Sequence, residues 1–309
     1  MTAECHPAVV SLMGGEPLLR PQLAIGLAEI LHEIGTQIVM GTGLYFARTP
    51  GIPRSIRAAV RAVDLVIVSL DIWHEAEVPR QRALDAISDL RELGCDVAIQ
   101  LTGRSYEDPY IQDTTQEVRD RFGNDVPLMV SKVSPVGRAT GLGLLPDAPI
   151  PLRRPEPCSG AYWPVVAFDG AVVACCNQSV VDGERPAELV LGSVESDSWP
   201  ALVERGLNST YLDLIRLAGP RFAAKSALGA SSDGDYCGTC LALAGRESEE
   251  RRVSSYVVSP KGRLELALLR TAKAPPPEEG FIPEEYHELL RLGHKPPIAQ
   301  HTAPEQVPA

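Results

Sequence analysis

The first half of the chain repeats one hydrophobic pattern about every thirty residues. Five runs rich in apolar and β-branched residues begin 28, 29, 32 and 31 residues apart. They span Ala8–Leu12, Thr36–Met40, Leu65–Leu70, Val97–Leu101 and Leu128–Val133. Between them lie segments with helical spacing of apolar residues, such as those that end at Gly35 and Gly94. A strand followed by a helix at a steady interval is the βα unit of a parallel sheet, so we predict an α/β domain.

The composition is that of a globular protein and excludes some classes of partner. Apolar residues make up 44% and charged residues 22% of the 309 residues, close to the average for globular chains. The formal charge is −11 and the sequence pI is about 5.1, whereas phosphate contacts need clustered Lys and Arg, so we expect no nucleic-acid partner. No run reaches the ~18 apolar residues of a membrane span, and no signal-peptide pattern opens the chain. We therefore expect no membrane partner and a cytoplasmic location.

Changes in pattern divide the chain into four parts. We predict a first domain over 1–139, a linker rich in Pro and Gly over 140–157, a small α+β domain over 158–271 and a Pro-rich, mostly irregular tail over 272–309. The small domain opens with two short β-like runs on either side of Asp169-Gly170, which is a strong hairpin signal. Helical spacing follows around Ala201–Arg205 and Tyr211–Leu217.

Four of the seven cysteines form one spaced set, with the pattern C-x11-G-x4-C followed after a gap by C-x2-C. Its members are Cys158, Cys175, Cys237 and Cys240, and the glycine is Gly170. Cytosolic thiols stay reduced, and thiolates bind iron and zinc well. A hairpin with the glycine at its tip would bring the first two sulfurs to one side. The set predicts a four-cysteine metal site, for iron or for structural zinc, and the alternative is four unrelated buried thiols.

The other three cysteines stand apart from this set. Cys176 directly follows a predicted ligand, and an adjacent thiol is more often a packed neighbour than a fifth ligand. Cys95 lies where a helical segment enters the fourth apolar run and is interpreted as a core residue. Neither is assigned to the predicted site, and Cys5 is not assigned to it either.

Glycines and polar residues directly follow the apolar runs. The first run leads into Gly14-Gly15-Glu16-Pro17, the second into Gly41-Thr42-Gly43, and the third ends at Ser69-Leu70-Asp71. Loops that follow parallel strands carry functional residues in barrels and open sheets. Two glycines allow a ligand to approach the backbone, the carboxylate of Glu16 can pair with a positive group, and Pro17 can start a helix. An ordinary turn is the alternative for the GGEP sequence.

The cysteine set and the GGEP sequence together resemble radical S-adenosylmethionine (radical SAM) enzymes with a C-terminal SPASM/twitch domain. The resemblance implies that Cys158, Cys175, Cys237 and Cys240 hold one auxiliary 4Fe-4S cluster. It implies an α/β fold class with a partial (β/α)6 radical SAM barrel that lacks its first βα unit, followed by a small α+β twitch/SPASM domain.

The resemblance also assigns residues to the cofactor S-adenosylmethionine. The methionyl amino group would be bound by the GGEP residues, Gly14, Gly15, Glu16 and Pro17. Ser69 and Asp71, in a segment with His74 and Arg80 that resembles the fourth strand of the family, would lie near the ribose and the substrate. Arg138 lies in a P-x-GRA run that resembles the end of the sixth strand.

Ordinary structural roles are the alternatives for these residues. Ser69 would be a cap, Asp71 a solvated loop charge, His74 a surface imidazole and Arg138 a salt-bridge partner. The Gly41-Thr42-Gly43 run also departs from the T-N-G loop that many relatives have in this place.

One part of the family pattern is absent from the sequence. The C-x3-C-x2-C segment, whose thiolates hold the catalytic 4Fe-4S cluster, is not found, and Cys5 is the one cysteine before Gly14. We expect a truncated form of an enzyme rather than a degenerate relative, because the first strand would otherwise leave an open sheet edge. The catalytic cluster is then expected only if an upstream segment exists.

The expected function is that of an enzyme, or part of one, that modifies a peptide or small molecule by radical hydrogen abstraction. Its expected partners are that substrate and an electron donor such as a flavodoxin or ferredoxin. The alternative is a non-catalytic iron-sulfur accessory or binding protein derived from the same family.

Overall fold

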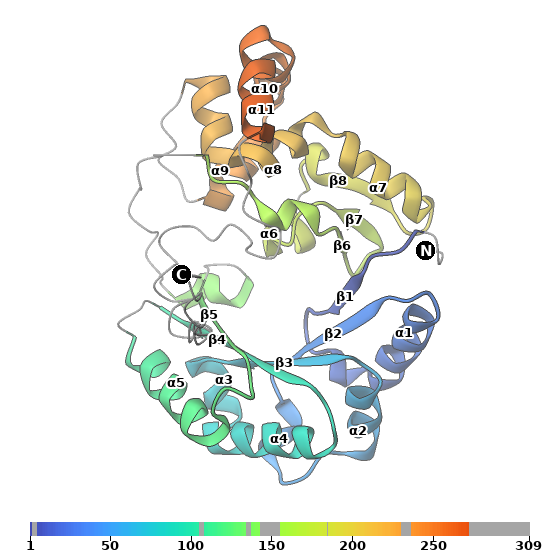
Figure 1. The fold of residues 1–309 in the computed structure, drawn as a ribbon, viewed down its shortest axis with the longest axis vertical. Coiled ribbons are helices and arrows are strands. Elements are labelled where there is room, and N and C mark those ends of the chain that lie inside the picture. The colour runs from blue at the N-terminus through green and yellow to red at the C-terminus, as the bar shows by residue number, and fades with distance from the viewer. Residues whose placement is uncertain are drawn as a thin grey trace, which may run out of the picture. The chain divides into compact units, whose positions relative to one another are not determined.

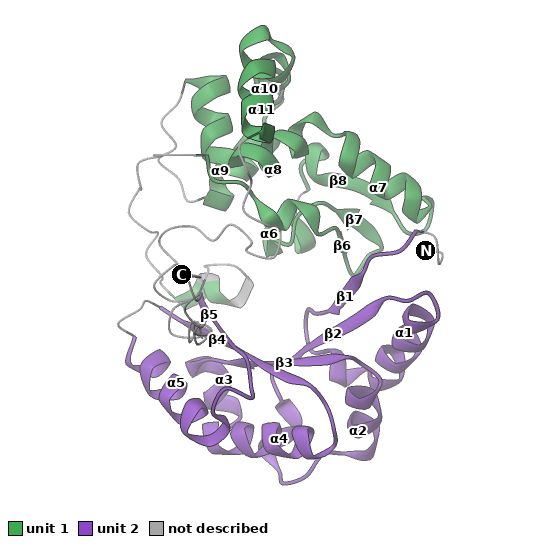
Figure 2. Ribbon diagram, in the orientation of Figure 1, with its two compact units in different colours: residues 1, 134–283 green, residues 2–133, 284–309 purple. Residues whose placement is uncertain are grey.

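A computed structural model describes residues 1, 5–104, 108–133, 137–142, 155–183, 185–229 and 236–271. The chain divides into two compact units near residue 133 (Figure 2). The sheet unit, purple in Figure 2, contains the described residues from 5 to 133. The cysteine unit, green in Figure 2, contains residue 1 and the described residues from 137 to 271. The predicted tail over 272–309 and most of the predicted linker, residues 143–154, lie outside the described residues.

The sheet unit is built on five parallel strands that neighbour one another in sequence order, as the repeated pattern predicts. They are β1 (Val9–Leu12), β2 (Gln37–Thr42), β3 (Leu65–Leu70), β4 (Val97–Gly103) and β5 (Leu128–Lys132). Each begins within about one residue of its predicted start, because these apolar runs contrast sharply with their surroundings. The prediction of an α/β domain with a parallel sheet is therefore confirmed.

The connecting helices gather on one side of this sheet (Figure 1). They are η1 (Pro17–Leu19), α1 (Pro21–Glu33), η2 (Tyr45–Arg48), α2 (Arg54–Arg61), α3 (Ile72–Glu77), α4 (Arg80–Glu92) and α5 (Pro109–Phe122). Right-handed crossovers between sequential parallel strands place every helix on the same face. On that face Met40, Val68 and Ile99 are fully buried in a core shared with the helices.

The opposite face of the sheet, called here the helix-free face, is half-buried rather than covered by these helices. Along β3 the burial alternates, so Ile67 and Ser69 are half-buried while their neighbours are buried. Continuous apolar runs favour strands that are covered on both faces, whereas among the described residues of the sheet unit helices cover one face. The alternation was hidden because positions such as Val39 and Ile67 on the helix-free face are also apolar.

The cysteine unit combines a small antiparallel sheet with helices. Its elements are η3 (Gly137–Leu142), η4 (Ser159–Tyr162), β6 (Val165–Val166), β7 (Ala171–Val173), α6 (Gln178–Asp182), η5 (Ala187–Leu189), β8 (Val190–Ser193), α7 (Trp199–Asn208), α8 (Thr210–Ala223), η6 (Ala224–Leu228), α9 (Tyr236–Ala244), α10 (Glu247–Val258) and α11 (Pro260–Thr271). The predicted hairpin is β6–β7, with Gly170 at φ +83°. Helices α7 and α8 contain the two predicted helical stretches, whereas β8 and α9 to α11 were not predicted from the sequence.

The end of the predicted linker belongs to this second fold. The backbone N–H of Glu156 donates to Ala218 at 2.9 Å, and that of Cys158 donates to Ile215 at 3.0 Å. Gly219 makes the approach possible, because a β-carbon there would stand 1.8 Å from the carbonyl oxygen of Glu156. Its φ of +78° is also a conformation that L residues with a side chain rarely adopt.

None of the helices in the described part of the chain has the length and apolar character that a membrane crossing requires.

Gly219→Ala should destabilise the cysteine unit by about 3 kcal/mol, since it adds both backbone strain and a clash with the segment that leads to Cys158. Gly229→Ala is the matched control, because Gly229 has φ +67° but open space around the β-carbon position, and should cost only about 1 kcal/mol. Urea unfolding followed by tryptophan fluorescence measures both. Equal losses in the two variants would contradict the role given to Gly219.

Candidate functional site

The loop after β1 is held to the loop after β2 by the carboxylate of Glu16. Its Oε1 accepts a hydrogen bond from the Leu18 N–H at 3.0 Å and so caps η1. Its Oε2 accepts from Thr42 Oγ1 at 3.0 Å and from the Gly43 N–H at 2.9 Å. A carboxylate offers about four acceptor positions, of which these bonds use three. Glu16 therefore joins the GGEP loop to the Gly-Thr-Gly loop and keeps little further capacity to accept hydrogen bonds.

The two glycines before Glu16 give this loop its shape. Gly14 has φ +80° and Gly15 has φ +49°, and nothing lies within 4 Å of the β-carbon position at either residue. The turn thus requires glycine for its backbone conformation. Pro17 follows as the first residue of η1, as expected of a proline that starts a helix.

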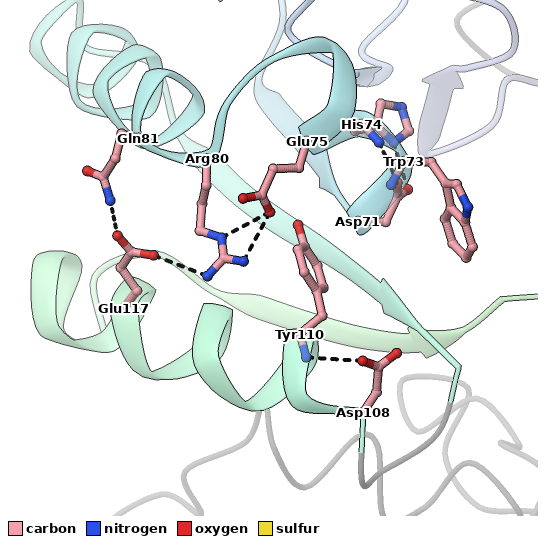
Figure 3. Close-up of polar contacts among 9 residues, drawn as sticks. All are labelled: Asp71, Trp73, His74, Glu75, Arg80, Gln81, Asp108, Tyr110 and Glu117. Atoms are coloured by element: carbon pink, nitrogen blue, oxygen red, sulfur yellow. Dashed lines mark hydrogen bonds and ion pairs between the residues drawn. The ribbon is translucent and has the colours of Figure 1, made fainter.

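Asp71 and His74 form a hydrogen-bonded pair after β3 (Figure 3). Asp71 is buried and caps α3, because its Oδ1 accepts from the N–H groups of Trp73 at 2.9 Å and His74 at 2.7 Å. Its Oδ2 lies 2.6 Å from Nδ1 of the His74 ring. Asp71 is therefore not the solvated loop charge that was the alternative in the sequence.

The His74 ring lies over the loop that Glu16 holds. A β-carbon on Gly43 would stand 2.9 Å from Nε2 of His74 and 3.9 Å from Oε2 of Glu16. The loops after β1, β2 and β3 thus meet around Gly43, as expected for the carboxyl ends of neighbouring parallel strands. The Gly41-Thr42-Gly43 loop was noted in the sequence, but its contact with His74 depends on the strand register.

The Asp71 carboxyl is charged at neutral pH. Burial raises its pKa, but hydrogen bonds from the His74 ring and backbone, together with the charge of His74, outweigh burial and hold the pKa below its ordinary value. An Asp71 carboxylate orients the imidazole so that Nε2 points towards the Gly43 loop, which is an arrangement suited to binding or proton transfer.

Polar side chains gather on the helix-free face at the same end of the sheet. Ser69 of β3 pairs in register with Gln100 of β4, and Thr102 of β4 pairs with Ser131 of β5. The hydroxyls of Thr102 and Ser131 lie 3.1 Å apart. Ser69 was predicted to belong to the site, whereas Gln100 and Ser131 were not. Their signal in the sequence is a polar residue at alternate positions of an otherwise apolar strand.

Arg80 belongs to a structural network rather than to this group (Figure 3). Its Nε and Nη2 donate to Oε2 of Glu75 at 3.1 and 3.0 Å, and its Nη1 lies 3.4 Å from Oε2 of Glu117. The guanidinium is 4.8 Å from the centroid of the Tyr110 ring, and Gln81 also donates to Glu117. These contacts join α3, α4 and α5.

Arg138, the last predicted residue of the cofactor group, lies in η3. Its side chain and residues 134–136 of the same run are outside the described residues.

In the cysteine unit, the four predicted cysteines come from three separate segments. Cys158 precedes η4, Cys175 follows β7, and Cys237 and Cys240 lie one turn apart on α9. Cys158, Cys175 and Cys240 are half-buried and pack against the same hydrophobic core, whereas Cys237 is exposed. All seven cysteines are described, and no disulfide joins any two of them.

The four thiols lie within electrostatic range of one another. Burial is the main cause that raises the pKa of Cys175 to about 11 and that of Cys240 to about 12, and the neighbouring thiols raise both further. For Cys240 these neighbours are Cys175, Cys158 and Cys237. Burial likewise raises the pKa of Cys158. Where no cation compensates for burial, the thiols are expected to be protonated. A bound metal ion would instead favour the thiolate form.

Three further residues line this cluster of thiols. Tyr211 Oη donates to the carbonyl oxygen of Cys240 at 3.0 Å and lies 3.4 Å from its Sγ. Tyr236 Oη donates to the carbonyl oxygen of Glu156 at 2.7 Å. The sulfurs of Cys158 and Cys176 both lie 3.7 Å from the β-carbon position of Gly160, so Cys176 is a neighbour of the cluster. The spacing of the tyrosines gave no signal in the sequence.

Cys95 and Cys5 lie in the sheet unit, apart from this cluster. Cys95 packs against the core of that unit, and its thiol lies 3.6 Å from the carbonyl oxygen of Val60. Within the described ranges, no three His, Cys, Asp or Glu side chains are already arranged as a metal-binding group.

Comparison of the sequence with models of known protein families gives no match, and comparison with curated protein sequences gives none either.

Asp71→Asn should lower the free energy of unfolding of the sheet unit by about 1 kcal/mol at pH 7, because it weakens a cap and removes the charge that holds His74. The pKa of the Asp71 carboxyl is lower in the folded state than its unfolded value of about 3.9. The charged carboxylate therefore stabilises the fold at pH values above about 3.9. The stabilisation is lost as the pH falls through the folded pKa, so the difference between wild type and variant should shrink in acid. Urea unfolding across a pH series measures this.

Asp113→Asn, at an exposed position of α5, is the control and should change the stability little at any of these pH values. A constant difference between Asp71→Asn and wild type from neutral to acid pH would show that the Asp71 charge does not stabilise the fold.

Proposed function

We propose that this chain is a relative of the radical SAM enzymes that holds a 4Fe-4S cluster in its cysteine unit and S-adenosylmethionine on its sheet unit. The observation that carries the proposal is that Cys158, Cys175 and Cys240, from three segments, pack against one core, while Cys237 lies one turn from Cys240 on α9. Four soft, anionic thiolates suit an iron-sulfur cluster, and the i, i+3 spacing on α9 sets two of them on one side of a helix. The donor set therefore fits the cluster in kind and in number.

The order of the strands supports a partial (β/α)6 barrel. In a doubly wound sheet the strand order reverses at a switch point, whereas β1 to β5 follow sequence order without a reversal. A sheet with all its helices outside can curve around a ligand on its inner face. In this proposal the helix-free face is the inner face of that barrel.

The residues of the helix-free face fit a polar cofactor. Ser69, Gln100, Thr102 and Ser131 offer hydroxyl and amide groups in neighbouring register positions. In this proposal, the GGEP loop forms one edge of the site, where Glu16 holds the loop in place. When bound and reduced by one electron from a catalytic 4Fe-4S cluster, S-adenosylmethionine would supply, as in this family, a radical that removes hydrogen from a substrate. The chain's own residues bind and orient the cofactor, and the substrate class stays a peptide or a small molecule.

Cys237→Ala and Cys240→Ala should each abolish most of the iron and sulfide that the protein binds after anaerobic purification, about four of each per chain in the wild type. Metal analysis and the visible absorption spectrum measure this loss. Cys95→Ala, outside the cluster, is the matched control and should keep the full content. Full iron content in Cys237→Ala, or zinc without iron in the wild type, would contradict the cluster.

Ser69→Leu should weaken the binding of S-adenosylmethionine at least about tenfold, because it places an apolar side chain among polar groups of the helix-free face. Equilibrium dialysis with labelled cofactor measures the affinity. Glu92→Leu, at an exposed position of α4 on the other side of the sheet, is the control and should bind as the wild type does. Unchanged affinity in Ser69→Leu would place the cofactor elsewhere.

A further inference from the structure

The sulfurs of two predicted ligands in the cysteine unit lie within reach of hydrogen-bond donors. The backbone N–H of Asn177 donates to Sγ of Cys175 at 3.4 Å. The hydroxyl oxygen of Tyr211 lies 3.4 Å from Sγ of Cys240. A donor stabilises a charged sulfur much more than a protonated thiol, so this arrangement suits thiolate ligands.

The third half-buried ligand, Cys158, has surroundings of the same kind. Burial raises the pKa of its thiol, whereas hydrogen bonds from the backbone N–H groups of Ala161 and Gly160 lower it. Tyr236 also contacts Cys158, but its hydroxyl donates to the carbonyl oxygen of Glu156 at 2.7 Å. Backbone donors are not removed by substitution, so the donor at Cys240 is the one that an experiment can remove cleanly.

That donor, Tyr211, is a buried phenol that can bond only within the protein. The residue is 3% exposed and lies in the first turn of α8. Its Oη donates to the carbonyl oxygen of Cys240 at 3.0 Å, while Sγ of the same cysteine lies 3.4 Å from that Oη. Burial raises the pKa of the phenol well above its ordinary value, so the hydroxyl keeps its proton at neutral pH.

The phenol has one proton to donate and two acceptors on the same cysteine. A neutral thiol is a weak acceptor, so the proton goes to the carbonyl oxygen of Cys240. A thiolate is charged and attracts the proton more strongly. Cys240 lies inside α9, so its carbonyl oxygen can accept from the N–H of Ala244, four residues further along the helix. Rotation of the O–H bond therefore moves the hydrogen bond to the sulfur without leaving a buried acceptor unpaired.

We propose that Tyr211 donates this hydrogen bond when the sulfur of Cys240 is a ligand of the iron-sulfur cluster, and that the bond makes the cluster easier to reduce. The inference rests on the proposed function and assigns Tyr211 as a positioning residue for electron uptake. Reduction adds one electron from the electron donor and moves no proton, so the phenol stays neutral. The added negative charge spreads over the sulfurs, and a donor at one of them stabilises the reduced form more than the oxidised form.

Tyr211→Phe should make the reduction potential of the cluster more negative by about 59 mV, which corresponds to about a tenfold change in the equilibrium constant for one electron. The substitution removes the hydroxyl and keeps the ring in the core, so the iron content should equal that of the wild type. The full-length protein is purified anaerobically with its cluster and titrated with dithionite in the presence of redox mediators. Electron paramagnetic resonance of the reduced cluster then measures the fraction reduced at each potential.

Tyr256→Phe is the matched control, because Tyr256 is buried in the same core and its hydroxyl donates to Glu265. This variant should keep the potential of the wild type. Electron–nuclear double resonance gives a second readout, since the reduced wild-type cluster should show an exchangeable proton that Tyr211→Phe lacks.

The possible outcomes separate this role from the proposed function. An unchanged potential in Tyr211→Phe, or loss of the cluster in that variant but not in Tyr256→Phe, would overturn the role of Tyr211 and leave the cluster in place. A wild-type protein that binds no iron-sulfur cluster would overturn the proposed function, and this inference with it.

Discussion

The handedness of the crossover between parallel strands governs the sheet unit. Because β1 to β5 neighbour one another in sequence order, each right-handed connection sends its helix to the same face. One face is then buried in a core with residues such as Met40 and Ile99, and the other is left without helices. The same constraint gathers the loops after the strands at one end of the sheet, where Glu16, Gly43 and His74 meet.

The fold of the cysteine unit depends on a close approach between the backbone before Cys158 and helix α8. Gly219 lets the segment before Cys158 pass over α8, and hydrogen bonds from Glu156 and Cys158 to α8 fix it there. The β6–β7 hairpin then places Cys175 beside the same core, and α9 adds Cys237 and Cys240. Buried thiols without a compensating cation have raised pKa values, and a metal centre would remove that cost.

Several predicted residues have a definite place in the structure, although not always the expected one. Asp71 caps α3 and contacts the His74 ring, so it is not the solvated loop charge that was its alternative role. Glu16, expected to bind an amino group, uses three of about four acceptor positions within the fold. Helices α10 and α11 were not predicted, because charged residues interrupt their apolar positions, and α9 is a short helix that begins within the C-x2-C segment. Ser131 and Gln100 were overlooked because each looks like an isolated polar residue until strand register places it in a row.

The sequence by itself determined the five parallel strands, the glycine turns and the hairpin at Gly170, because these depend on local periodicity and on backbone conformations that only certain residues adopt. Only the tertiary structure decided which face of the sheet stays free of helices, that Gly43 lies between Glu16 and His74, and that Tyr211 stands beside Cys240. Those relations join residues from separate strands and helices, so they follow from register and packing, which local sequence does not encode.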